Sequence, residues 1–481
     1  MSLIDLKNYV AGKLVAPHAN NWLDNVNPAT GETYSRVPES DSRDVQAAVA
    51  AAREAFPNWS SLPSAERANW LRRLADAIDA HFEELAAAET NDNGKPIRYS
   101  RTVDIPRVSV NFRFFASMCE SFASESHASS DGINYTLRQP IGVVTCISPW
   151  NLPLYLFTWK IAPALATGNC VVGKPSEVTP YTAFLLGKIC HEIGFPAGVL
   201  NILHGSGGGV GNAIVTHEGI QAVSFTGGTK TGAHIAAQVA PRFKKLSLEL
   251  GGKNPNIIFA DCDYEQTLQT TLRSSFQNQG QICLCGSRVY VQRPIFAKFC
   301  DDLSELTKRL AVGDPMDPQT EQGAVVSAPH QQKILSYIEL AKQEGGEIRV
   351  GGAAATIPGR CANGFFVQPT IITGLDDQCR TNQEEIFGPV ITIQPFDDED
   401  EVIARANSTP YGLSATIWTN QLQRAHRVAK ALDVGVVWIN SWLVRDLRTP
   451  FGGVKNSGVG SEAGLESMRI FTEPKNVFVK Y

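Results

Sequence analysis

Hydrophobic residues between positions 43 and 93 recur at the three- and four-residue spacing of amphipathic helices. The repeating positions are Ala47, Ala48, Ala51, Ala52 and Phe56, followed by Leu71, Leu74, Ala75, Ile78 and Phe82. Ser64 and Glu66 come directly after Pro63, which is typical of a helix start. The pattern therefore predicts two helices in this segment.

From residue 141 the pattern changes to short apolar runs that alternate with helical segments. Strands are predicted at 141–147, 169–173, 199–203, 222–226 and 245–249. Helices are predicted between them at 182–193, about 209–217 and 230–239. This alternation is typical of a parallel, doubly wound sheet, which binds ligands at the carboxyl ends of its strands.

A second α/β unit is predicted from residue 254 onward. Its expected elements are 254–259, 276–291, a helix at 329–345, a strand at 388–395, a helix at 399–407 and a strand at 435–440. The tail, 467–481, alternates like an edge strand, and a partner subunit commonly covers such a strand. Because 481 residues exceed what one core usually serves, we expect an α/β fold with two or three subdomains.

Composition excludes several classes of function. The net charge is −5 and no basic run is present, so nothing favours nucleic acid or an anionic membrane. The N-terminus lacks the apolar core of a signal peptide. The most apolar stretch, 141–165, cannot span a membrane because polar residues and prolines interrupt it: Pro149, Asn151, Pro153, Lys160 and Pro163.

The cysteines and histidines point to a cytoplasmic enzyme without a metal. Ten cysteines follow no paired C-x-x-C pattern, so we expect reduced thiols. Nine histidines show no ligand spacing, so no metal site is expected.

Two segments carry candidate chemistry. Cys283 lies in a Gly- and Gln-rich loop, 277–288, and Glu249 lies 34 residues upstream in the Gly-flanked apolar segment 248–253. A lone cysteine is usually a small buried hydrophobe. Covalent catalysis, however, needs a nucleophile and a base, and burial raises a carboxyl pKa toward neutrality. The pairing therefore favours Cys283 as nucleophile and Glu249 as base.

Two Gly-rich loops are candidates for phosphate binding. Residues 205–211 look closer to a dinucleotide fingerprint but lack the acidic residue after the next strand, which favours a turn. Residues 225–232 follow a strand and open a helix, where backbone N–H groups can bind a pyrophosphate. Glu177, beside Lys174, can accept bonds from ribose hydroxyls and would repel a 2′-phosphate, which favours NAD over NADP. The alternative is that Glu177 is an exposed surface carboxylate.

Together these motifs resemble the aldehyde dehydrogenase superfamily over almost the whole chain. The matching segments are 27–31, 149–153, 174–177, 225–227, 248–253, 280–283, 384–389 and 450–453. The resemblance implies the aldehyde dehydrogenase fold. It assigns a Rossmann-like NAD-binding domain to 1–117 and 141–251, an α/β catalytic domain to 252–456, and a small β oligomerisation element to 118–140 and 467–481. It also implies a homodimer or homotetramer.

The resemblance further implies residue roles. Cys283 would attack the aldehyde, Asn151 and the Cys283 backbone N–H would hold the oxyanion, and Glu249 would activate the hydrolytic water. NAD would be bound by Trp150, Lys174, Glu177, Gly227, Gly228, Gly232, Leu250, Glu385 and Phe387. Glu462 matches a distal acid of the family's proton relay. The chain departs from the family at Gly228, where many relatives have Ser, and at Ser461, where they have Arg.

A narrower resemblance concerns the substrate. Segments 101–107 and 440–448 are similar to the 2-aminomuconic and 2-hydroxymuconic semialdehyde dehydrogenases, whose substrates carry a carboxylate far from the aldehyde. Arg107 and Arg445 match that family's substrate-binding arginines, and Arg448 is a third candidate. Alternatively, they are structural ion-pair partners, for instance of Asp104 and Asp446.

The leading hypothesis is an NAD-dependent aldehyde dehydrogenase that oxidises a carboxylated, unsaturated semialdehyde. The alternatives are a general aliphatic or retinal-type aldehyde dehydrogenase, a thioester-forming esterase, and a catalytically silent member of the fold. Retention of the Cys283, Glu249 and Asn151 set argues against the silent alternative.

Overall fold

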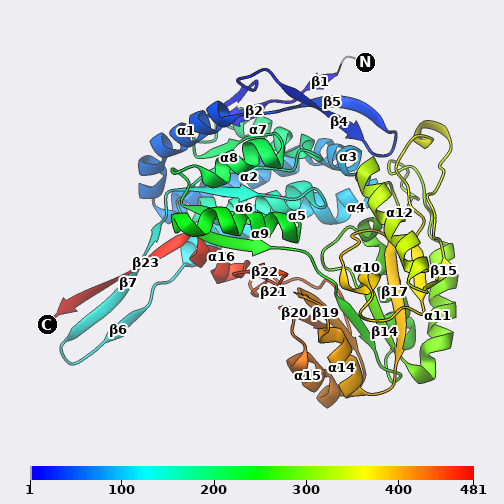
Figure 1. Ribbon diagram of the computed structural model, residues 1–481. Helices are drawn as coiled ribbons and strands as arrows, with labels where there is room; N and C mark the ends of the chain where they lie inside the picture. The colour runs from blue at the N-terminus through cyan, green and yellow to red at the C-terminus, as the bar shows by residue number, and fades with distance from the viewer. Residues whose placement is uncertain (1–2) are drawn as a thin grey trace.

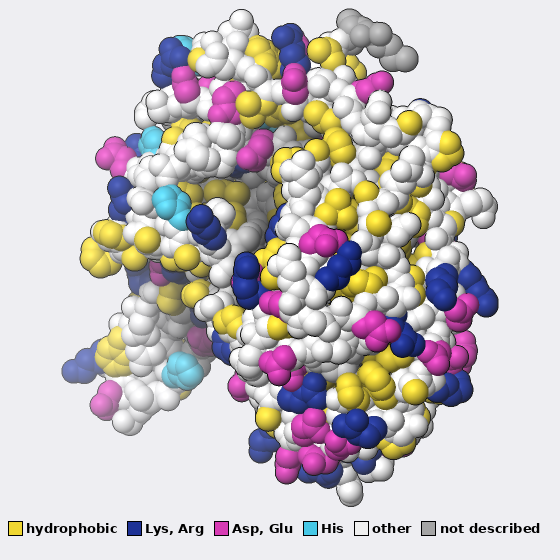
Figure 2. Space-filling model, turned by 45° about the vertical axis from the view of Figure 1, so that its right-hand side comes forward, with side chains coloured by type: hydrophobic (Ala, Val, Ile, Leu, Met, Phe, Trp, Pro, Cys, Tyr) yellow, Lys and Arg dark blue, Asp and Glu magenta, His cyan; other side chains and the backbone are white. Residues whose placement is uncertain are grey.

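The computed structural model describes residues 3–481. Two α/β units lie side by side, and a narrow β arm extends away from the first of them (Figure 1). The surface is hollowed between the two units, with apolar side chains at the edge of the hollow (Figure 2). The sites described below lie where the two units meet.

The first unit is built on an eight-stranded sheet in the order β22-β12-β11-β8-β9-β10-β2-β3. The strands are β2 (Asn8–Val10), β3 (Lys13–Val15), β8 (Val143–Ile147), β9 (Cys170–Lys174), β10 (Leu200–Ile202), β11 (Ala222–Thr226), β12 (Lys245–Glu249) and β22 (Gly458–Val459). The five central strands are parallel, whereas β22 adds to one side antiparallel and the β2–β3 hairpin adds to the other side antiparallel, with β3 at the edge. The five predicted strands and the doubly wound pattern are therefore confirmed.

Helices cover both faces of this sheet (Figure 1). They are α1 (Ser42–Ser61), α2 (Ser64–Ala80), α3 (Phe82–Asn93), α5 (Ile105–Ser121), α6 (Pro153–Ala166), α7 (Tyr181–Glu192), α8 (Asn212–Thr216), α9 (Thr229–Val239) and α16 (Gly464–Ile470). Between α3 and α5 lie the short α4 (Ile97–Tyr99) and a π-helical turn, η1 (Ser100–Asp104). A second π-helical turn, η2 (Gly207–Gly211), precedes α8.

The prediction of two helices over 43–93 was wrong, because the segment contains three. The predicted start at Ser64 is confirmed, but the chain breaks at His81, whose backbone angles (φ −102°, ψ 20°) end α2 and begin α3. No Gly or Pro marks this break, and the apolar spacing continues through it to Phe82. Periodicity alone therefore could not detect it.

The second unit contains a seven-stranded sheet in the order β15-β16-β17-β14-β13-β19-β20, parallel except for β15. Its strands are β13 (Pro255–Ile258), β14 (Arg288–Gln292), β15 (Glu347–Val350), β16 (Thr370–Thr373), β17 (Val390–Phe396), β19 (Ser414–Trp418) and β20 (Val436–Ile439). Its helices are α10 (Tyr264–Phe276), α11 (Arg293–Lys308), α12 (Ala328–Gln343), α13 (Arg380–Gln383), α14 (Glu399–Asn407) and α15 (Leu422–Ala431).

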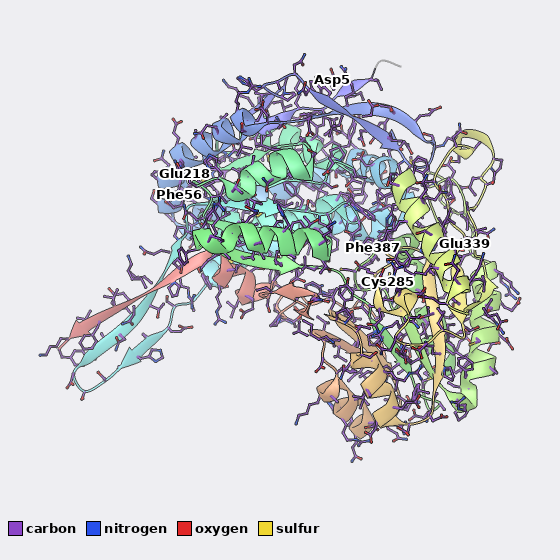
Figure 3. The ribbon with its side chains drawn as sticks, viewed as in Figure 1. Asp5, Phe56, Glu218, Cys285, Glu339 and Phe387 are labelled. Atoms are coloured by element: carbon purple, nitrogen blue, oxygen red, sulfur yellow. The ribbon has the colours of Figure 1, made fainter. Side chains whose placement is uncertain are left out.

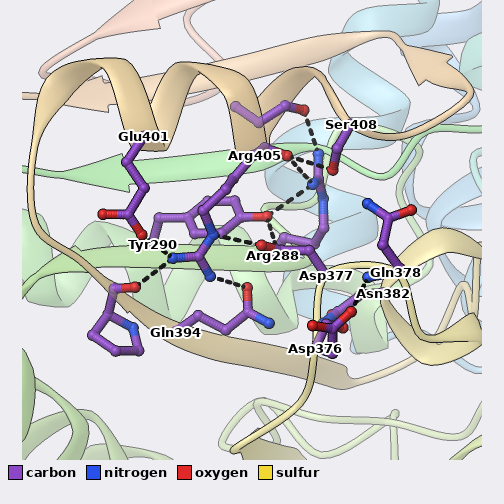
Figure 4. A network of polar contacts seen from close by, with 12 residues as sticks. Arg288, Tyr290, Asp376, Asp377, Gln378, Asn382, Gln394, Glu401, Arg405 and Ser408 are labelled. Carbon is purple, nitrogen blue, oxygen red and sulfur yellow. Dashed lines mark hydrogen bonds and ion pairs between the residues drawn. The ribbon is translucent and has the colours of Figure 1, made fainter.

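A buried arginine joins this sheet to the segment that carries the candidate base. Arg288 on β14 donates to the carbonyl oxygen of Lys253 at 2.9 Å, to the Tyr290 hydroxyl at 2.9 Å and to the carbonyl of Ala406 at 2.8 Å (Figure 4). The Tyr290 hydroxyl in turn donates to Asp377 at 2.8 Å. These bonds hold the loop after Glu249 against the second unit.

The arm is a three-stranded antiparallel sheet in the order β23-β7-β6. Its strands are β6 (Ser126–Ala128), β7 (Gly132–Pro140) and β23 (Thr472–Lys480). The predicted edge strand is correct for β23 but wrong for its first residues, because residues up to Ile470 form α16. The remaining strands form two small sheets: β1 (Ile4–Asp5), β4 (Trp22–Asn27) and β5 (Glu32–Pro38), and β18 (Tyr411–Gly412) with β21 (Val454–Lys455).

The apolar stretch 141–165 divides into strand β8 and helix α6, with Pro149 and Pro153 in and after the turn between them. Among residues 3–481, no helix combines the length and apolar character that a membrane span requires.

Candidate active site

The candidate nucleophile lies in a tightly constrained loop after α10. Asn278 and Gln279 adopt left-handed backbone angles (φ 53° and 55°), and Gly280 follows with φ 67°. A side chain at Gly280 would collide with the carbonyl oxygen of Gly388, so only glycine allows this approach. The loop that presents Cys283 is thereby packed against the loop of the 384–389 motif.

Cys283 lines two cavities at once. One has a volume of about 320 Å³ and also contains Glu249. The other, of about 240 Å³, also contains Asn151 and Glu385. Cys285 borders neither of these cavities and is buried. It lies with Cys283 and Phe387 at a much smaller space of about 20 Å³, lined by the nucleophile loop and the 384–389 motif (Figure 3).

The Cys283 thiol is protonated in this environment. Burial raises the pKa of the Cys283 thiol, and the nearby Glu385 and Glu249 carboxyls raise it further, while Arg445 opposes the shift. A thiol must lose its proton to become a strong nucleophile, so attack requires deprotonation of Cys283.

Glu249 is the last residue of β12 and is buried, and its carboxyl oxygens accept no hydrogen bond from residues 3–481. Burial raises its pKa well above the ordinary value, the charge of Glu462 adds to this, and Lys160 and Arg445 oppose it. A carboxyl with a raised pKa is suited to general base catalysis near neutral pH.

Asn151 lies in the turn between β8 and α6. Its side-chain amide donates one hydrogen bond to the carbonyl oxygen of Gln281 at 2.9 Å. The second amide hydrogen makes no bond to the described part of the chain, and neither does the backbone N–H of Cys283. Two donors beside the thiol are thus available for a developing oxyanion.

A cluster of hydrogen-bonded side chains lies next to the cavity of Glu249, and only one member, Glu462, was expected from the sequence. Lys160 donates to Glu462 at 2.6 Å and to Ser224 at 3.0 Å, and Trp159 donates to Glu462 at 2.9 Å. Glu462 also lines the cavity that contains Glu249. Lys160 and Glu462 lie 302 residues apart in the chain, and no local pattern links them.

The wall of the 320 Å³ cavity includes both predicted substrate-binding arginines. The Arg445 guanidinium carbon lies 3.9 Å from the Phe451 ring centroid and 5.7 Å from that of Trp159. The Arg107 guanidinium lies 5.4 Å from the ring centroid of Tyr155. Arg107 lies on α5 and Arg445 lies in the loop after β20, yet both border the same cavity as Cys283.

The ion pairs considered for these arginines do not form. Asp104 pairs with Lys95, and Asp446 pairs with Arg448 at 2.6 Å. Within residues 3–481, neither Arg107 nor Arg445 has a carboxylate partner. Arg448, the third candidate, is exposed and does not border the cavity.

A cavity of about 380 Å³ lies between β9 and the start of α9. Glu177 borders it and forms an ion pair with the buried Lys174 at 3.1 Å. Burial alone would raise the pKa of Glu177, but Lys174 and backbone N–H groups, including that of Gly207, outweigh it and lower that pKa. Glu177 is therefore ionised and only partly exposed, rather than a free surface carboxylate.

Both Gly-rich loops border this cavity. In the first loop the Ser206 hydroxyl caps η2 by accepting a hydrogen bond from the Gly209 N–H at 3.2 Å. This loop is therefore a turn, as expected. Gly207 nevertheless lines the cavity. In the second loop Gly227 and Gly228 line the cavity at the N-terminus of α9. Space is open above Gly228, where an added Cβ would meet no atom within 4 Å.

Gly232 does not border the cavity. It is buried one turn into α9, where a side chain would collide with Leu250. Leu250 itself lines the cavities on both sides of Cys283. The structure thus brings Leu250 to the site directly and Gly232 only through packing, and the cofactor role of Gly232 stays a prediction.

Trp150, Glu385 and Phe387 line the 240 Å³ cavity next to Cys283. Glu385 is half-buried and accepts the Gly252 N–H at 2.9 Å. The Trp150 ring lies edge-on to Phe387, with centroids 5.2 Å apart. The positive φ of Phe387 (61°) turns its ring toward this contact.

Two residues of this cavity were not found from the sequence. The His330 ring lies 4.9 Å from Trp150 and bonds the Phe387 carbonyl oxygen at 2.7 Å, and burial lowers the pKa of His330 to about 4. Lys333 donates to the carbonyl oxygen of Glu385 at 3.0 Å. Both come from α12, whose sequence shows only a helical pattern.

The cavities at Glu177 and at Cys283 share the residues Trp150, Thr226, Gly227 and Gly228. Together they form a continuous channel with a carboxylate at one end, free helix N–H groups in the middle and the thiol at the other. This donor and acceptor set fits an extended dinucleotide. No group of His, Cys, Asp and Glu side chains suited to a metal ion is present in the described residues.

Comparison with known proteins shows what this chain is similar to. Residues 14–477 match the model of the "Aldehyde dehydrogenase family". The chain is 50% identical to 2-aminomuconic semialdehyde dehydrogenase of Danio rerio, covering 100% of this chain and 99% of that one. It is 47% identical to 2-hydroxymuconic semialdehyde dehydrogenase of a Pseudomonas species, covering 99% of each. An NAD⁺ complex of aldehyde dehydrogenase from Bacillus cereus superposes with a TM-score of 0.96 at 40% identity. The match covers 99% of this chain and 96% of that one.

Proposed function

We propose that this chain, which belongs to the aldehyde dehydrogenase family, catalyses the NAD-dependent oxidation of a carboxylated, unsaturated semialdehyde to the acid. The observation that carries the substrate class is the position of Arg107 and Arg445. Both border the cavity of Cys283 and Glu249, and neither is neutralised by a carboxylate of the described chain.

The channel from Glu177 to Cys283 would hold NAD. Glu177 and Lys174 would contact the adenosine ribose, and Glu385 and Phe387 the nicotinamide ribose. The backbone N–H of Gly228, at the start of α9, would bind the pyrophosphate, with Gly227 lining the same cavity while its own N–H donates to the Glu249 carbonyl oxygen at 3.1 Å. When bound, NAD supplies the hydride acceptor. The NAD⁺ complex of the Bacillus cereus relative supports this choice of cofactor.

Cys283 would lose its proton to solvent in the cavity and attack the aldehyde carbon as thiolate, giving the thiohemiacetal anion. Loss of the hydride from the same carbon, for which NAD is the acceptor, would then leave a thioester on Cys283. The negative charge that develops on the aldehyde oxygen would be held by the free amide hydrogen of Asn151 and the backbone N–H of Cys283. Because these donors are already positioned by the bond from Asn151 to Gln281, no reorganisation is needed during attack.

Glu249 would then activate water for hydrolysis of the thioester on Cys283. Its unpaired, buried carboxyl has the raised pKa that this task requires. Glu462, Lys160 and Ser224 form the bonded group through which the proton could leave the cavity.

The distal carboxylate of the substrate would bind Arg107 and Arg445. The substrates in question are 2-aminomuconate and 2-hydroxymuconate semialdehyde, and the names of two relatives at 47–50% identity support them. A general aliphatic or retinal-type substrate would leave both guanidinium groups without a partner in an otherwise largely apolar wall, at a desolvation cost. A catalytically silent protein would have no need of the free oxyanion donors.

The β arm would pair with another copy of the chain through the edge of β23, giving a homodimer or homotetramer. All ten cysteines are unpaired, which suits the reducing cytoplasm.

The decisive experiment compares kcat/KM for 2-hydroxymuconate semialdehyde, 2-aminomuconate semialdehyde and hexanal, with NADH formation as the readout. We expect the carboxylated substrates to be preferred by roughly tenfold or more, since a charge-assisted hydrogen bond is worth about 1.5–3 kcal/mol. Equal or better turnover of hexanal would contradict the substrate class but not the oxidation of aldehydes.

A further inference from the structure

The turn formed by Asn93, Gly94 and Lys95 lies between the two loops that carry the reaction. Gln279, in the nucleophile loop, donates to the carbonyl oxygen of Gly94 at 3.2 Å. Asn93 donates to the carbonyl of Trp150 at 2.8 Å. Gly94 closes α3 in a left-handed conformation (φ 83°), and a Cβ there would meet the Ala324 carbonyl oxygen at 2.7 Å. These contacts fix the position of the turn against both loops.

Lys95 extends from this turn to the backbone of Asn151. Its ammonium group is completely buried and donates to the Asn151 carbonyl oxygen at 3.0 Å. Asn278 donates to the same oxygen at 3.1 Å. The bond from Lys95 is charge-assisted, and such bonds are roughly twice as strong as neutral ones. Asn93 adds a longer bond to this oxygen at 3.4 Å. Asn151 is thus held through its backbone by Lys95, Asn278 and Asn93, and through its side chain by Gln281.

The ammonium is in turn held by two buried carboxyls. Asp104 accepts a hydrogen bond from it, and Glu89 lies 3.6 Å away. Neither oxygen of Glu89 has a hydrogen-bond partner in the described chain. Burial raises the pKa of both carboxyls, and the charge of the Lys95 ammonium opposes this shift in each of them. Asp104 also ends the π-helical turn from which α5 and Arg107 begin.

We propose that Lys95 is a positioning residue that sets the Asn151 amide against Cys283 for oxyanion binding, a role that rests on the proposed function. Lys95 touches neither thiol nor cavity; it acts by holding the Asn151 backbone. The cluster with Asp104 and Glu89 keeps the ammonium in place, because a buried cation without a counter-ion would lose its charge.

The test is Lys95→Met, which keeps the length and removes the charge, assayed with 2-hydroxymuconate semialdehyde and with hexanal. Since displacement of a catalytic group by about 1 Å can cost 10²-fold, we expect kcat to fall about tenfold to a hundredfold. KM for aldehyde and NAD binding should change less than about threefold, because no binding residue is touched. Lys95→Arg should recover part of the loss.

A double-mutant cycle separates positioning from general damage. If Lys95 acts through Asn151, the Lys95→Met change should have little further effect on kcat in an Asn151→Ala background, since coupled residues are not additive. Thr90→Val is the matched control. Thr90 bonds Ser100 at 2.8 Å between α3 and η1, in the same buried layer, but does not reach Asn151. It should lower thermal stability while leaving kcat within about twofold of wild type.

Four outcomes would overturn the proposal. A wild-type kcat in folded Lys95→Met contradicts it directly, as does full additivity with Asn151→Ala. If Lys95→Met does not fold, Asp104→Asn replaces it, and a wild-type kcat there counts against the proposal in the same way. If the wild-type protein oxidises neither aldehyde with NAD, the proposed function itself is wrong and the positioning role falls with it.

Discussion

Arg445 lies over the ring of Phe451, with the guanidinium carbon 3.9 Å from the ring centroid, at the wall of the cavity that contains Cys283. The ring fixes the guanidinium without neutralising it, because a cation–π contact leaves the charge in place. A carboxylate of the substrate is therefore the natural partner of this group.

We expect Arg445→Ala and Arg107→Ala each to raise KM for a muconic semialdehyde. The loss of a charge-assisted hydrogen bond, about 1.5–3 kcal/mol, corresponds to roughly tenfold to a hundredfold. Hexanal has no carboxylate, so its kinetics should stay nearly constant. Arg448→Ala is the control, because Arg448 is exposed and already paired with Asp446. Equal losses on both substrates would assign the two arginines a structural role.

The two neighbouring cysteines should behave differently. Cys283→Ala should abolish dehydrogenase turnover and leave NAD binding intact, because only the attacking atom is removed. Cys285→Ala should stay active, since Cys285 is buried away from both large cavities. Steady-state kinetics and calorimetric titration with NAD measure the two effects. An inactive Cys285→Ala beside an active Cys283→Ala would reverse the assignment.

Loss of the base should stop the reaction after oxidation. Glu249→Ala should give a burst of NADH of about one equivalent and then stall, because no group activates water. Mass spectrometry of the stalled protein should detect an acyl group on Cys283. Unchanged steady-state turnover would show that hydrolysis does not depend on Glu249.

The pH dependence of hydrolysis should depend on Glu462. The base form of Glu249 exists only above its pKa, which burial and then Glu462 raise above the ordinary value of 4.5. Turnover limited by hydrolysis should therefore fall as pH drops through this raised pKa. Glu462→Gln removes a negative charge, so the acidic limb of the kcat profile should move to lower pH. Glu466→Gln, on the exposed side of α16, should leave the limb where it is. A limb that does not move in Glu462→Gln would contradict this origin of the raised pKa.

Cofactor preference should follow Glu177. Its ionised carboxylate would repel the 2′-phosphate of NADP, so kcat/KM should favour NAD. Glu177→Gln should lower the ratio of kcat/KM for NAD to that for NADP by about tenfold. Repulsion between close like charges costs several kcal/mol when they are desolvated, and less when the carboxylate is partly exposed, as Glu177 is. The ratio of kcat/KM for the two cofactors is the measurement. A wild-type preference for NADP would refute this role of Glu177.

Local patterns predicted much of the molecule. The strands at 222–226 and 245–249 match β11 and β12 residue for residue, because each is a short apolar run with a turn after it. The pairing of Cys283 with Glu249 was also predicted, and both residues line one cavity. The break at His81 was not predicted, since no local signal marks it.

The sequence by itself determined the doubly wound α/β pattern and the chemical nature of the reactive groups. Both depend on residues that lie within a few positions of one another in the chain. Only the tertiary structure decided which charges remain free. Arg107 and Asp104 lie three residues apart, yet Asp104 points to Lys95 and Arg107 to the cavity. Glu462 reaches Lys160 across 302 residues. An ion pair depends on distance in space, which the folded backbone sets, and so Arg107 and Asp104 did not become partners although they are neighbours in the chain.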